Sequence, residues 1–373
     1  RDALHRPRHE HVKPQVLDRA EFIGRQTLEQ DGPGGLVSSA CCHIMGGEFP
    51  YHWGELPTAV AGIRNMALDA VRRQEADGGW GFYPDEAHLS LGEPGTKTAG
   101  TSAPPALQIA KWVAISGDPE CEAALRKAMD FLRAQAVPRG AQGWECPILQ
   151  PDVLASAYAV RACVWAYMAL GDPAYIEEAQ RWARTGLAFQ YAWDDGAHPG
   201  MRYASIPVFG STFYTHTWLG RPLIWMGLDY AYALQDLAPF DESFDWLGVA
   251  ERITRSAAWQ QYPDGPSKGL IPDSWEMATN TPNPADIAPT LLLLNGHRLR
   301  AHSLEVRFAR LHIAGRRVHL NSSADIAHAA CTGDGVVHIS LRGVPGSTAH
   351  SALAQVPEPV SVDGAGHRVD SDE

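Results

Sequence analysis

One short stretch of the chain carries side chains that can move a proton or neutralise a negative charge. Arg202, Tyr203, Tyr214 and His216 supply a cation, two phenols and an imidazole within fifteen residues. Tyrosine and histidine can act as general base and general acid, and a guanidinium can neutralise a carboxylate. Elimination next to a uronate carboxylate needs this combination. We therefore expect Tyr214 and His216 to be base and acid, and Arg202 to neutralise the carboxylate.

Carboxyl groups in the predicted loops offer a different chemistry. Hydrolysis of a glycosidic bond needs two carboxyl groups, about 5–10 Å apart across the bond that breaks. Asp195 and Glu276 are the least typical of helix caps, so we name them as the candidate pair. Asp152 and Asp273 are instead typical of helix N-caps, where a carboxylate accepts hydrogen bonds from backbone N–H groups. The other acidic residues of these loops are Asp77, Asp85, Glu86, Glu145 and Asp194.

Aromatic side chains are frequent in the same loops. The chain has 12 tryptophans, and several lie in predicted loops rather than in helices. Sugar rings present a C–H face that stacks on Trp and Tyr, so these residues are candidates for substrate binding. The same rings can equally seal the loops onto the helix ends, and the sequence leaves both interpretations open. The candidates are Trp53, Trp80, Tyr83, Trp144, Trp193 and Trp275, with His52 and Asn280 as polar candidates beside them.

The cysteines and histidines show no metal-ligand spacing. The six cysteines include no CxxC pair, and the vicinal Cys41-Cys42 followed by His43 is more typical of a core or loop pair than of a metal site. We therefore expect no metal and no cofactor. The redox state of the cysteines stays open.

The charge and hydropathy of the chain restrict its partners. With a net charge of −12, the chain lacks the basic field that nucleic acid binding requires, so we expect no nucleic acid partner. We find no apolar run that approaches about 18 residues, and we expect no membrane-spanning helix. The chain begins at Arg1 without Met or a signal-like apolar segment, which is typical of a trimmed form.

The candidate residues lie on a repeated unit in which glutamine ends a helix. Between Arg73 and Phe82, a glutamine closes an apolar-periodic helix and a Gly-Gly turn brings an aromatic residue back over its end. Similar glutamines recur roughly every fifty to seventy residues, which fits two helices and two loops per unit. One unit cannot bury its apolar face alone, so the units must pack in an array. The glutamines are Gln26, Gln74, Gln135, Gln190 and Gln261.

Short and long connections alternate between the predicted helices. Gly117-Asp118-Pro119 and Gly171-Asp172-Pro173 predict tight helix-to-helix turns, whereas the connections rich in glycine and aromatic residues are long. We expect the short connections at one end of the array and the long loops at the other. Residues 201–214 are β-like and predict a strand pair or a loop wall. The predicted helices are 16–30, 59–73, 104–115, 120–135, 153–170, 175–189, 215–234, 247–261 and 287–294.

The pattern changes after the last predicted helix. Alternating apolar residues in 302–318 and the run 336–341 predict strands, and Gly and Pro punctuate this region at short intervals. We interpret 1–296 as an α/α toroid of about five to six helical hairpins, whose mouth the long loops line. Residues 297–373 are then a smaller antiparallel β domain, similar to part of a β-sandwich.

The helix-ending glutamine resembles the QW motif of the terpenoid-cyclase and prenyltransferase toroids. Gln74-x-x-x-Gly78-x-Trp80 carries this resemblance, which implies a structural role: glutamine and glycine tie the helix end to the loop, and Trp80 covers the joint. The Asp-x-Asp-Asp proton donor of the cyclases is absent from the helical region. A terpenoid-cyclase-like enzyme therefore stays only as an alternative.

The order of the two domains resembles the carbohydrate-active α/α toroids. In polysaccharide lyases of this kind the toroid comes first and an antiparallel β-sandwich follows, whereas many toroid hydrolases carry their β domain in front. The resemblance implies a secreted or periplasmic enzyme that cleaves glycosidic bonds of a polysaccharide or oligosaccharide, with a polysaccharide lyase as the leading interpretation. A glycoside hydrolase with paired carboxylates in the same toroid is one alternative. A non-catalytic glycan-binding or scaffold toroid is another.

Overall fold

The computed structural model describes most of the chain from residue 56 onwards. The predicted helix 16–30 and the glycine-rich loop that follows it lie outside the described residues. These are residues 56–192, 202–209, 221–277, 279–283, 286–287, 289–300, 305, 307–313, 315–332, 336–342 and 349–356.

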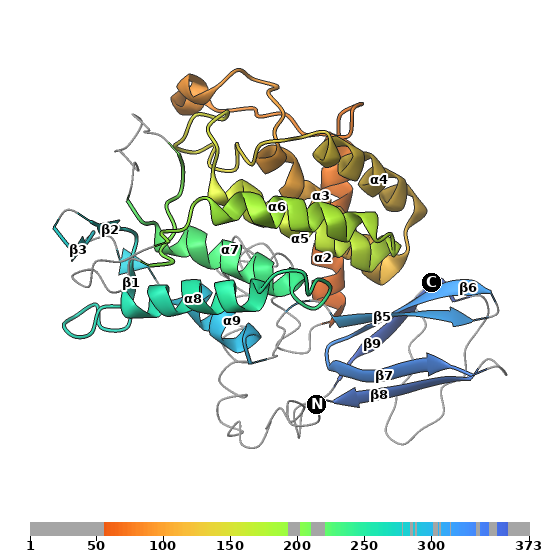
Figure 1. Cartoon of the computed structure of the whole chain (residues 1–373). Helices are drawn as coiled ribbons and strands as arrows, with labels where there is room; N and C mark the ends of the chain where they lie inside the picture. The colour runs from red at the N-terminus through yellow and green to blue at the C-terminus, as the bar shows by residue number, and fades with distance from the viewer. Residues whose placement is uncertain are drawn as a thin grey trace.

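Helices make up most of the described chain before residue 300 (Figure 1). A short 3₁₀ helix, η2 (Glu86–Leu91), lies in the loop between the first two of them. The α-helices are α2 (Leu56–Arg73), α3 (Ala99–Ser116), α4 (Pro119–Arg133), α5 (Val153–Leu170), α6 (Ala174–Leu187), α7 (Ile224–Leu237), α8 (Trp246–Trp259) and α9 (Thr290–Arg298).

The helices alternate between an inner and an outer layer. Helices α3, α5 and α7 are apolar and buried on nearly all sides, whereas α2, α4, α6 and α8 bury one face and expose the other. The inner helices pack side by side, α3 against α5 and α5 against α7, and α9 continues the row beside α7. Because successive helices reverse direction, the inner helices all run the same way. The described residues therefore form a curved double layer of four helical hairpins.

Two of the predicted helix starts are wrong. Helix α3 begins at Ala99 rather than at residue 104, because Thr98 and Thr101 form a capping box in which each hydroxyl oxygen accepts the other residue's backbone N–H. Helix α7 begins at Ile224 rather than at residue 215, because Leu223 is extended and forms a β-bridge with Ser274. The bounds of α5 agree with the prediction.

Helix α5 corrects the expectation that the chain has no long apolar run. Its 18 residues are apolar enough to cross a membrane by length and composition. However, 83% of the helix is buried inside the protein, between α3 and α7. Its one charged residue, Arg161, is held in buried ion pairs. We therefore identify α5 as the central helix of the protein core.

The short connections have the geometry that the Gly-Asp-Pro repeats predict. Gly117 and Gly171 end α3 and α5 in the left-handed conformation, with φ of 65° and 81°, which favours glycine. Asp118 then caps α4 by accepting hydrogen bonds from the N–H groups of Glu120 and Cys121. Both turns lie at the carboxyl ends of the inner helices, so the short connections share one end of the helical layer.

The long connections all precede inner helices and therefore lie at the opposite end, which we call the long-loop end. Isolated β-bridges join neighbouring loops there: Asp152 pairs with Val208, and Leu223 pairs with Ser274, while Gln190 pairs with Ser205 inside the connection before α7. The predicted β-like segment 201–214 contributes to this wall through its described part, residues 202–209. The loops before α5, α7 and α9 consequently form one connected rim.

The strands after α9 form a smaller antiparallel unit, at the lower right of Figure 1. One sheet has the order β5-β6-β9, a second pairs β7 with β8, and an apolar core that includes Leu311, Val318 and Leu320 lies between them. This arrangement is similar to a small β-sandwich. The strands are β5 (Arg307–Ile313), β6 (Arg316–Ser322), β7 (Asp325–Cys331), β8 (Val337–Arg342) and β9 (Ser351–Ala354).

The three-stranded sheet turns its other face towards the short-connection end of the helices. The ring of Phe308 lies 5.8 Å from that of Trp165, and the Arg310 guanidinium donates to the carbonyl oxygen of Ala169 at 3.0 Å. The Nδ1 atom of His319 is 2.7 Å from the carbonyl oxygen of Ala114. The two units are therefore joined by specific packing and hydrogen bonds.

A buried ionic cluster reinforces this junction. Glu305, which precedes β5, forms ion pairs with Arg161 on α5 and with Lys111 on α3. Arg161 also binds Asp236 on α7, and Arg298 at the end of α9 binds the other oxygen of Asp236. Burial favours the neutral acid, but Arg161 and Lys111 outweigh it and hold the pKa of Glu305 at about 2. Glu305 thus links three inner helices to the β domain.

Candidate active site

The loop after α2 shows what the glutamine repeat does. The side-chain amide of Gln74 donates to the carbonyl oxygens of Gly78, at 3.0 Å, and of Ala124 in α4, at 2.9 Å. The indole N–H of Trp80 donates to the carbonyl oxygen of Ala70, and the ring is 4% exposed. Trp80 therefore covers the joint between helix and loop, as the QW resemblance implied. Its ring is sealed in the core and cannot stack on a sugar in this structure.

Tyr83, on the same loop, is exposed. Its hydroxyl donates to Glu75 at 3.1 Å, and Lys97 bridges Glu75 and Asp77 with both distances at 2.8 Å. The hydrogen bond to Glu75 raises the pKa of Tyr83, so this phenol keeps its proton. Tyr83 is thus a solvent-facing aromatic ring with a fixed hydroxyl, which suits a binding role more than that of a base.

An aromatic pair lies where the loop before α5 meets the start of α7. The rings of Trp144 and Trp225 stack, and the Trp225 indole N–H donates to Asp273 at 3.2 Å. Asp273 was expected to cap a helix, and this expectation is wrong. It lies in the bend between β1 (Ile271–Pro272) and β2 (Trp275–Glu276), where its carboxylate accepts from the indole. Side chains from two distant loops and α7 therefore meet at one place.

Two more candidates continue this surface along the loop before α9. The Trp275 indole N–H donates to the side-chain oxygen of Asn280 at 3.1 Å, and Glu276 forms an ion pair with Arg221. Asn280 is in the left-handed conformation, with φ of 53°, which is uncommon outside glycine and typical of turns and functional sites. Strand β2 pairs with β3 (Thr281–Pro282) through this turn. The structure thus brings Trp144, Trp275, Glu276 and Asn280 to the long-loop end.

Arg202 and Tyr203 lie on the neighbouring part of the rim. The Arg202 guanidinium is 5.5 Å from the Tyr203 ring, and Arg252 on α8 lies 5.1 Å from the same ring. Arg252 is also within 3.5 Å of Asp245, whereas the structure shows no carboxylate of the described residues paired with Arg202, which is exposed. Tyr203 is left-handed, with φ of 70°. Arg202 is consequently a positioned cation that can bind the carboxylate of a ligand.

The inner face of α7 leads from this rim into the core. Trp225, Asp229, Tyr232 and Asp236 follow one another at the spacing that places side chains on one face of a helix. Tyr232 and Asp236 contact Arg161 of α5, so this face points at the inner layer. Asp229 therefore lies one helical turn below Trp225, between the aromatic pair and the ionic cluster.

Asp229 has an unusual environment. It is 2% exposed, and neither carboxylate oxygen forms a hydrogen bond with any residue that the structure describes. Burial raises the pKa of Asp229 well above its ordinary value, and the charge of Arg161 offsets only part of this effect. A raised pKa lets a carboxyl group keep its proton to higher pH, and a protonated carboxyl group can donate a proton, as a general acid must.

Asp152 is the helix N-cap that the sequence predicted. Its two oxygens accept from the N–H groups of Ala155 in α5, at 2.6 Å, and of Ala141 in the preceding loop, at 3.0 Å. Burial raises the pKa of Asp152 to about 7, although these backbone hydrogen bonds act in the opposite direction. All of its contacts are structural, so we assign Asp152 to the rim and not to the chemistry.

Several sequence candidates lie outside the described residues. These are His52, Trp53, Trp193, Asp195, Tyr214 and His216. Their assignments stay predictions. Sequence reasoning also missed three residues of this site: Arg221, Trp225 and Asp229. The signal for Asp229 was an acidic residue in the apolar first half of α7, because burying a charged group is costly unless it has a partner.

A metal centre has no counterpart in the part of the chain that the structure covers. No three His, Cys, Asp or Glu side chains gather among those residues as metal ligands would. The four cysteines within the described ranges, Cys121, Cys146, Cys163 and Cys331, are free thiols.

Comparison with known proteins identifies the fold. No protein-family model and no curated protein matches the sequence. Among solved structures, the chain is similar to a polysaccharide lyase, with a TM-score of 0.52 and 12% identity over 78% of this chain and 78% of that chain. It is also similar to an unsaturated glucuronyl hydrolase from Bacillus sp. GL1, with a TM-score of 0.47 and 16% identity over 77% and 79% of the two chains. A third is a cellobiose 2-epimerase from Bacillus thermoamylovorans, with a TM-score of 0.47 and 11% identity over 68% and 69%. At this identity the likeness concerns the fold, and the chain is an α/α toroid followed by a smaller antiparallel β domain.

Proposed function

We propose that this protein is a carbohydrate-active enzyme that cleaves glycosidic bonds of an acidic polysaccharide by β-elimination at a uronate. The reaction takes place at the long-loop end of the toroid. A base removes the proton next to the uronate carboxylate, a C=C bond forms, and the bond to the leaving sugar oxygen breaks while an acid protonates that oxygen. A polymeric substrate of this kind suits a secreted or periplasmic enzyme.

The observation that supports elimination is the position of Arg202. The negative charge of the uronate opposes removal of the neighbouring proton, so a lyase needs a group that neutralises it. Arg202 is exposed on the rim, is held over the Tyr203 ring, and has no carboxylate partner among the described residues. Tyr214 and His216, a short distance along the chain, are the proposed base and acid.

The order of the domains agrees with this proposal. The toroid precedes the antiparallel β domain, as in the lyases that the sequence resembles. The solved structure of a polysaccharide lyase has the same fold, although it does not by itself assign the reaction. The exposed ring of Trp144, which Trp225 supports, and the partly exposed ring of Trp275 then provide stacking for sugar rings on either side of the bond that breaks.

Hydrolysis is the second candidate function, and Asp229 is the observation that favours it. A hydrolase needs one protonated and one ionised carboxyl group. Asp229 is buried without a hydrogen-bond partner among the described residues, which favours its neutral form, while the ion pair with Arg221 keeps Glu276 charged. The favoured protonation states of Asp229 and Glu276 therefore differ in the way that hydrolysis requires. In this alternative Asp229 donates the proton and Glu276 acts as the base or nucleophile.

One assay separates these chemistries. The whole protein is incubated with a panel of uronate and neutral polysaccharides, and both the absorbance of new C=C bonds and new reducing ends are recorded. A lyase gives both signals on uronate polymers, and a hydrolase gives only reducing ends. A non-catalytic glycan-binding protein gives neither, and that result would overturn the proposal.

A pair of matched variants then tests Arg202. Arg202→Gln should lower kcat/KM on the uronate polymer by about 10²-fold or more, because the carboxylate loses its neutralising charge. Arg252→Gln removes the other cation from the same Tyr203 ring and should stay near the wild type. If both variants lose activity equally, the loss comes from removing a cation that supports the Tyr203 ring and not from removing the charge that neutralises the carboxylate. If Tyr214→Phe and His216→Ala both keep full activity, the proposed base and acid are wrong.

A further inference from the structure

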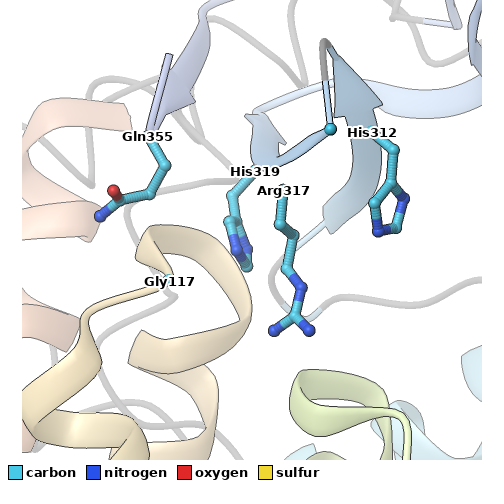
Figure 2. A pocket seen from close by; sticks show the side chains of 6 residues that line it. Gly117, His312, Arg317, His319 and Gln355 are labelled. Atoms are coloured by element: carbon cyan, nitrogen blue, oxygen red, sulfur yellow. The ribbon is translucent and has the colours of Figure 1, made fainter. Parts of the chain in front are cut away.

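A polar cavity lies at the end of the molecule opposite the long loops. It lies between the carboxyl end of α3 and the β5-β6-β9 sheet (Figure 2). Its volume is about 310 Å³. This volume is at the lower end of the range for ligand pockets, about 300–1,000 Å³, and fits one sugar ring better than a longer chain. The lining residues are Gly117, His312, Gly315, Arg317, His319 and Gln355.

The register of the sheet concentrates positive charge beside this cavity. His312 on β5 pairs directly with Arg317 on β6, and Arg310 pairs with His319 in the same way. Within the described residues, the one carboxylate found near Arg317 is Glu122, at 3.8 Å, which is long for an ion pair. Burial, together with the charge of Arg317, lowers the pKa of Arg310. The cationic side chains therefore outnumber their partners here.

His319 contributes a hydrogen-bond acceptor to the same cavity. A carbonyl oxygen can only accept, so the Nδ1 atom of His319 must donate its proton to Ala114. Burial lowers the pKa of His319, which keeps the ring neutral and leaves Nε2 without a proton. The ring is 1% exposed, and no residue that the structure describes forms a hydrogen bond with Nε2.

Gly117 leaves the space in front of this nitrogen open. A Cβ atom at this position would lie 2.6 Å from Nε2 of His319, so any other residue would collide with the ring. Figure 2 shows Arg317 and His319 side by side on β6, with His312 on one side and Gln355 on the other. The cavity thus offers a guanidinium donor, a neutral imidazole acceptor and a side-chain amide.

These groups select a ligand with two properties. A fully deprotonated anion such as sulfate satisfies Arg317 but gives nothing to the unprotonated Nε2, because the anion and Nε2 are both hydrogen-bond acceptors. A ligand that carries a carboxylate and an adjacent hydroxyl satisfies both, since its hydroxyl donates to Nε2. We propose that this cavity binds a uronate residue, with the carboxylate on Arg317, a hydroxyl on His319 and a second hydroxyl on Gln355.

The identity of the ligand as a sugar rests on the proposed function, whereas the need for an anion with a hydroxyl does not. A second uronate site also answers an electrostatic problem. With a net charge of −12, the protein as a whole repels an acidic polymer, and a local cationic site offsets this repulsion. The cavity would hold one part of the polymer while another part reaches the long-loop end.

The experiment follows histidine side-chain NMR signals of the full chain during titration with free glucuronate. The signals of His319 and His312 are assigned with His319→Gln and His312→Gln. Glucuronate should shift the His319 signal, and Arg317→Gln should weaken this binding at least tenfold. Arg316→Gln removes an exposed cation that precedes Arg317 but does not line the cavity, and it should bind as the wild type does.

Inorganic sulfate and glucose complete the titrations. Sulfate that shifts His319 at the same concentration as glucuronate would show an anion site that does not need a hydroxyl donor and would overturn the proposal. Glucose that binds equally well, or binding that is unchanged in Arg317→Gln, would also overturn it. So would the absence of any shift.

Activity separates this inference from the proposed function. Arg317→Gln should leave cleavage of short oligosaccharides unchanged and raise KM only on long polymers. If no polysaccharide is cleaved but glucuronate still shifts His319, the proposed function fails and the cavity stands. Cleavage without a shift gives the reverse conclusion.

Discussion

The indole rings of Trp144 and Trp225 stack with their centroids 6.2 Å apart and their planes at 29°. One ring comes from the loop before α5 and the other from the first turn of α7, so the stack joins two inner helices at their amino ends. The hydrogen bond from Trp225 to Asp273 fixes the second ring from a third loop. Trp144 remains 39% exposed and is therefore the part of this stack that a ligand can reach.

Trp144→Ala should weaken binding of an oligosaccharide substrate with little effect on the chemical step. An aromatic stacking contact contributes about 0.5–1.5 kcal/mol, so we expect Kd or KM to rise roughly two- to twelvefold. Phe240→Ala is the control, because Phe240 is 40% exposed but follows the carboxyl end of α7. Calorimetric titration and steady-state kinetics of both variants measure the difference. Equal effects at the two positions would remove Trp144 from the binding surface.

The sequence could predict the helical architecture because its signals are local. The Gly-Asp-Pro turns, the cap at Asp152 and the span of α5 depend on neighbouring residues, and the structure confirms all three. The start of α3 depends on the local capping box of Thr98 and Thr101, which the prediction of a start at residue 104 overlooked, whereas the start of α7 could not be predicted. At α7, the bridge between Leu223 and Ser274 overrides the local pattern, and such a contact depends on tertiary structure.

The candidate site was predictable only in part for the same reason. Loop aromatic residues can be identified by type, but Trp80 and Trp144 differ in their packing partners, which the sequence does not show. Trp80 packs on its own helix end, whereas Trp144 meets a ring from another hairpin. Asp229 was missed because the polar face of an inner helix becomes visible only when its neighbours are placed.

Gln74→Ala should destabilise the fold more than Gln261→Ala does. Gln74 donates two hydrogen bonds, one of which crosses to α4, whereas Gln261 donates one described hydrogen bond to the carbonyl oxygen of Gly269. Each net hydrogen bond contributes about 0.5–1.5 kcal/mol, which predicts a loss of about 1–3 kcal/mol for Gln74→Ala. Urea unfolding of both variants measures the order. A larger loss of stability for Gln261→Ala would show that the hydrogen bonds of Gln74 do not stabilise the repeated unit.

Asp229→Asn distinguishes the two proposed chemistries. If Asp229 donates the proton in hydrolysis, the amide should lower kcat by about 10²–10⁴-fold. If the enzyme is a lyase that uses Tyr214 and His216, kcat should stay near the wild type. The measurement is kcat on the cleaved polymer, with Asp325→Asn as a control acid on the β domain.

The stability of the same variant should depend on pH. The pKa of Asp229 is higher in the folded than in the unfolded chain. The carboxyl group therefore opposes folding increasingly as pH rises above 3.8, the ordinary pKa of aspartic acid. Asp229→Asn removes this penalty, so its stability relative to the wild type should increase as pH rises above 3.8. Thermal unfolding at several pH values tests this. A relative gain that shrinks as pH rises would show that Asp229 is ionised in the folded protein.

Glu305→Gln should show the opposite pH dependence. The pKa of Glu305 falls from 4.5 to about 2 in the folded protein, because Arg161 and Lys111 outweigh the effect of burial. Its ion pairs therefore stabilise the fold above pH 4.5 and lose this contribution as pH falls towards 2. Removing one member of a buried ion-paired cluster costs about 3–5 kcal/mol, so the loss should be large at neutral pH and small near pH 3.

Asp325→Asn is the control, because its pair with Arg307 is partly exposed and should contribute about 1 kcal/mol or less. Urea unfolding of the wild type and of both variants at pH 7 and pH 3 gives the six free energies of unfolding. A Glu305→Gln loss that is the same at both values would show that the carboxylate does not hold the inner helices to the β domain through its charge.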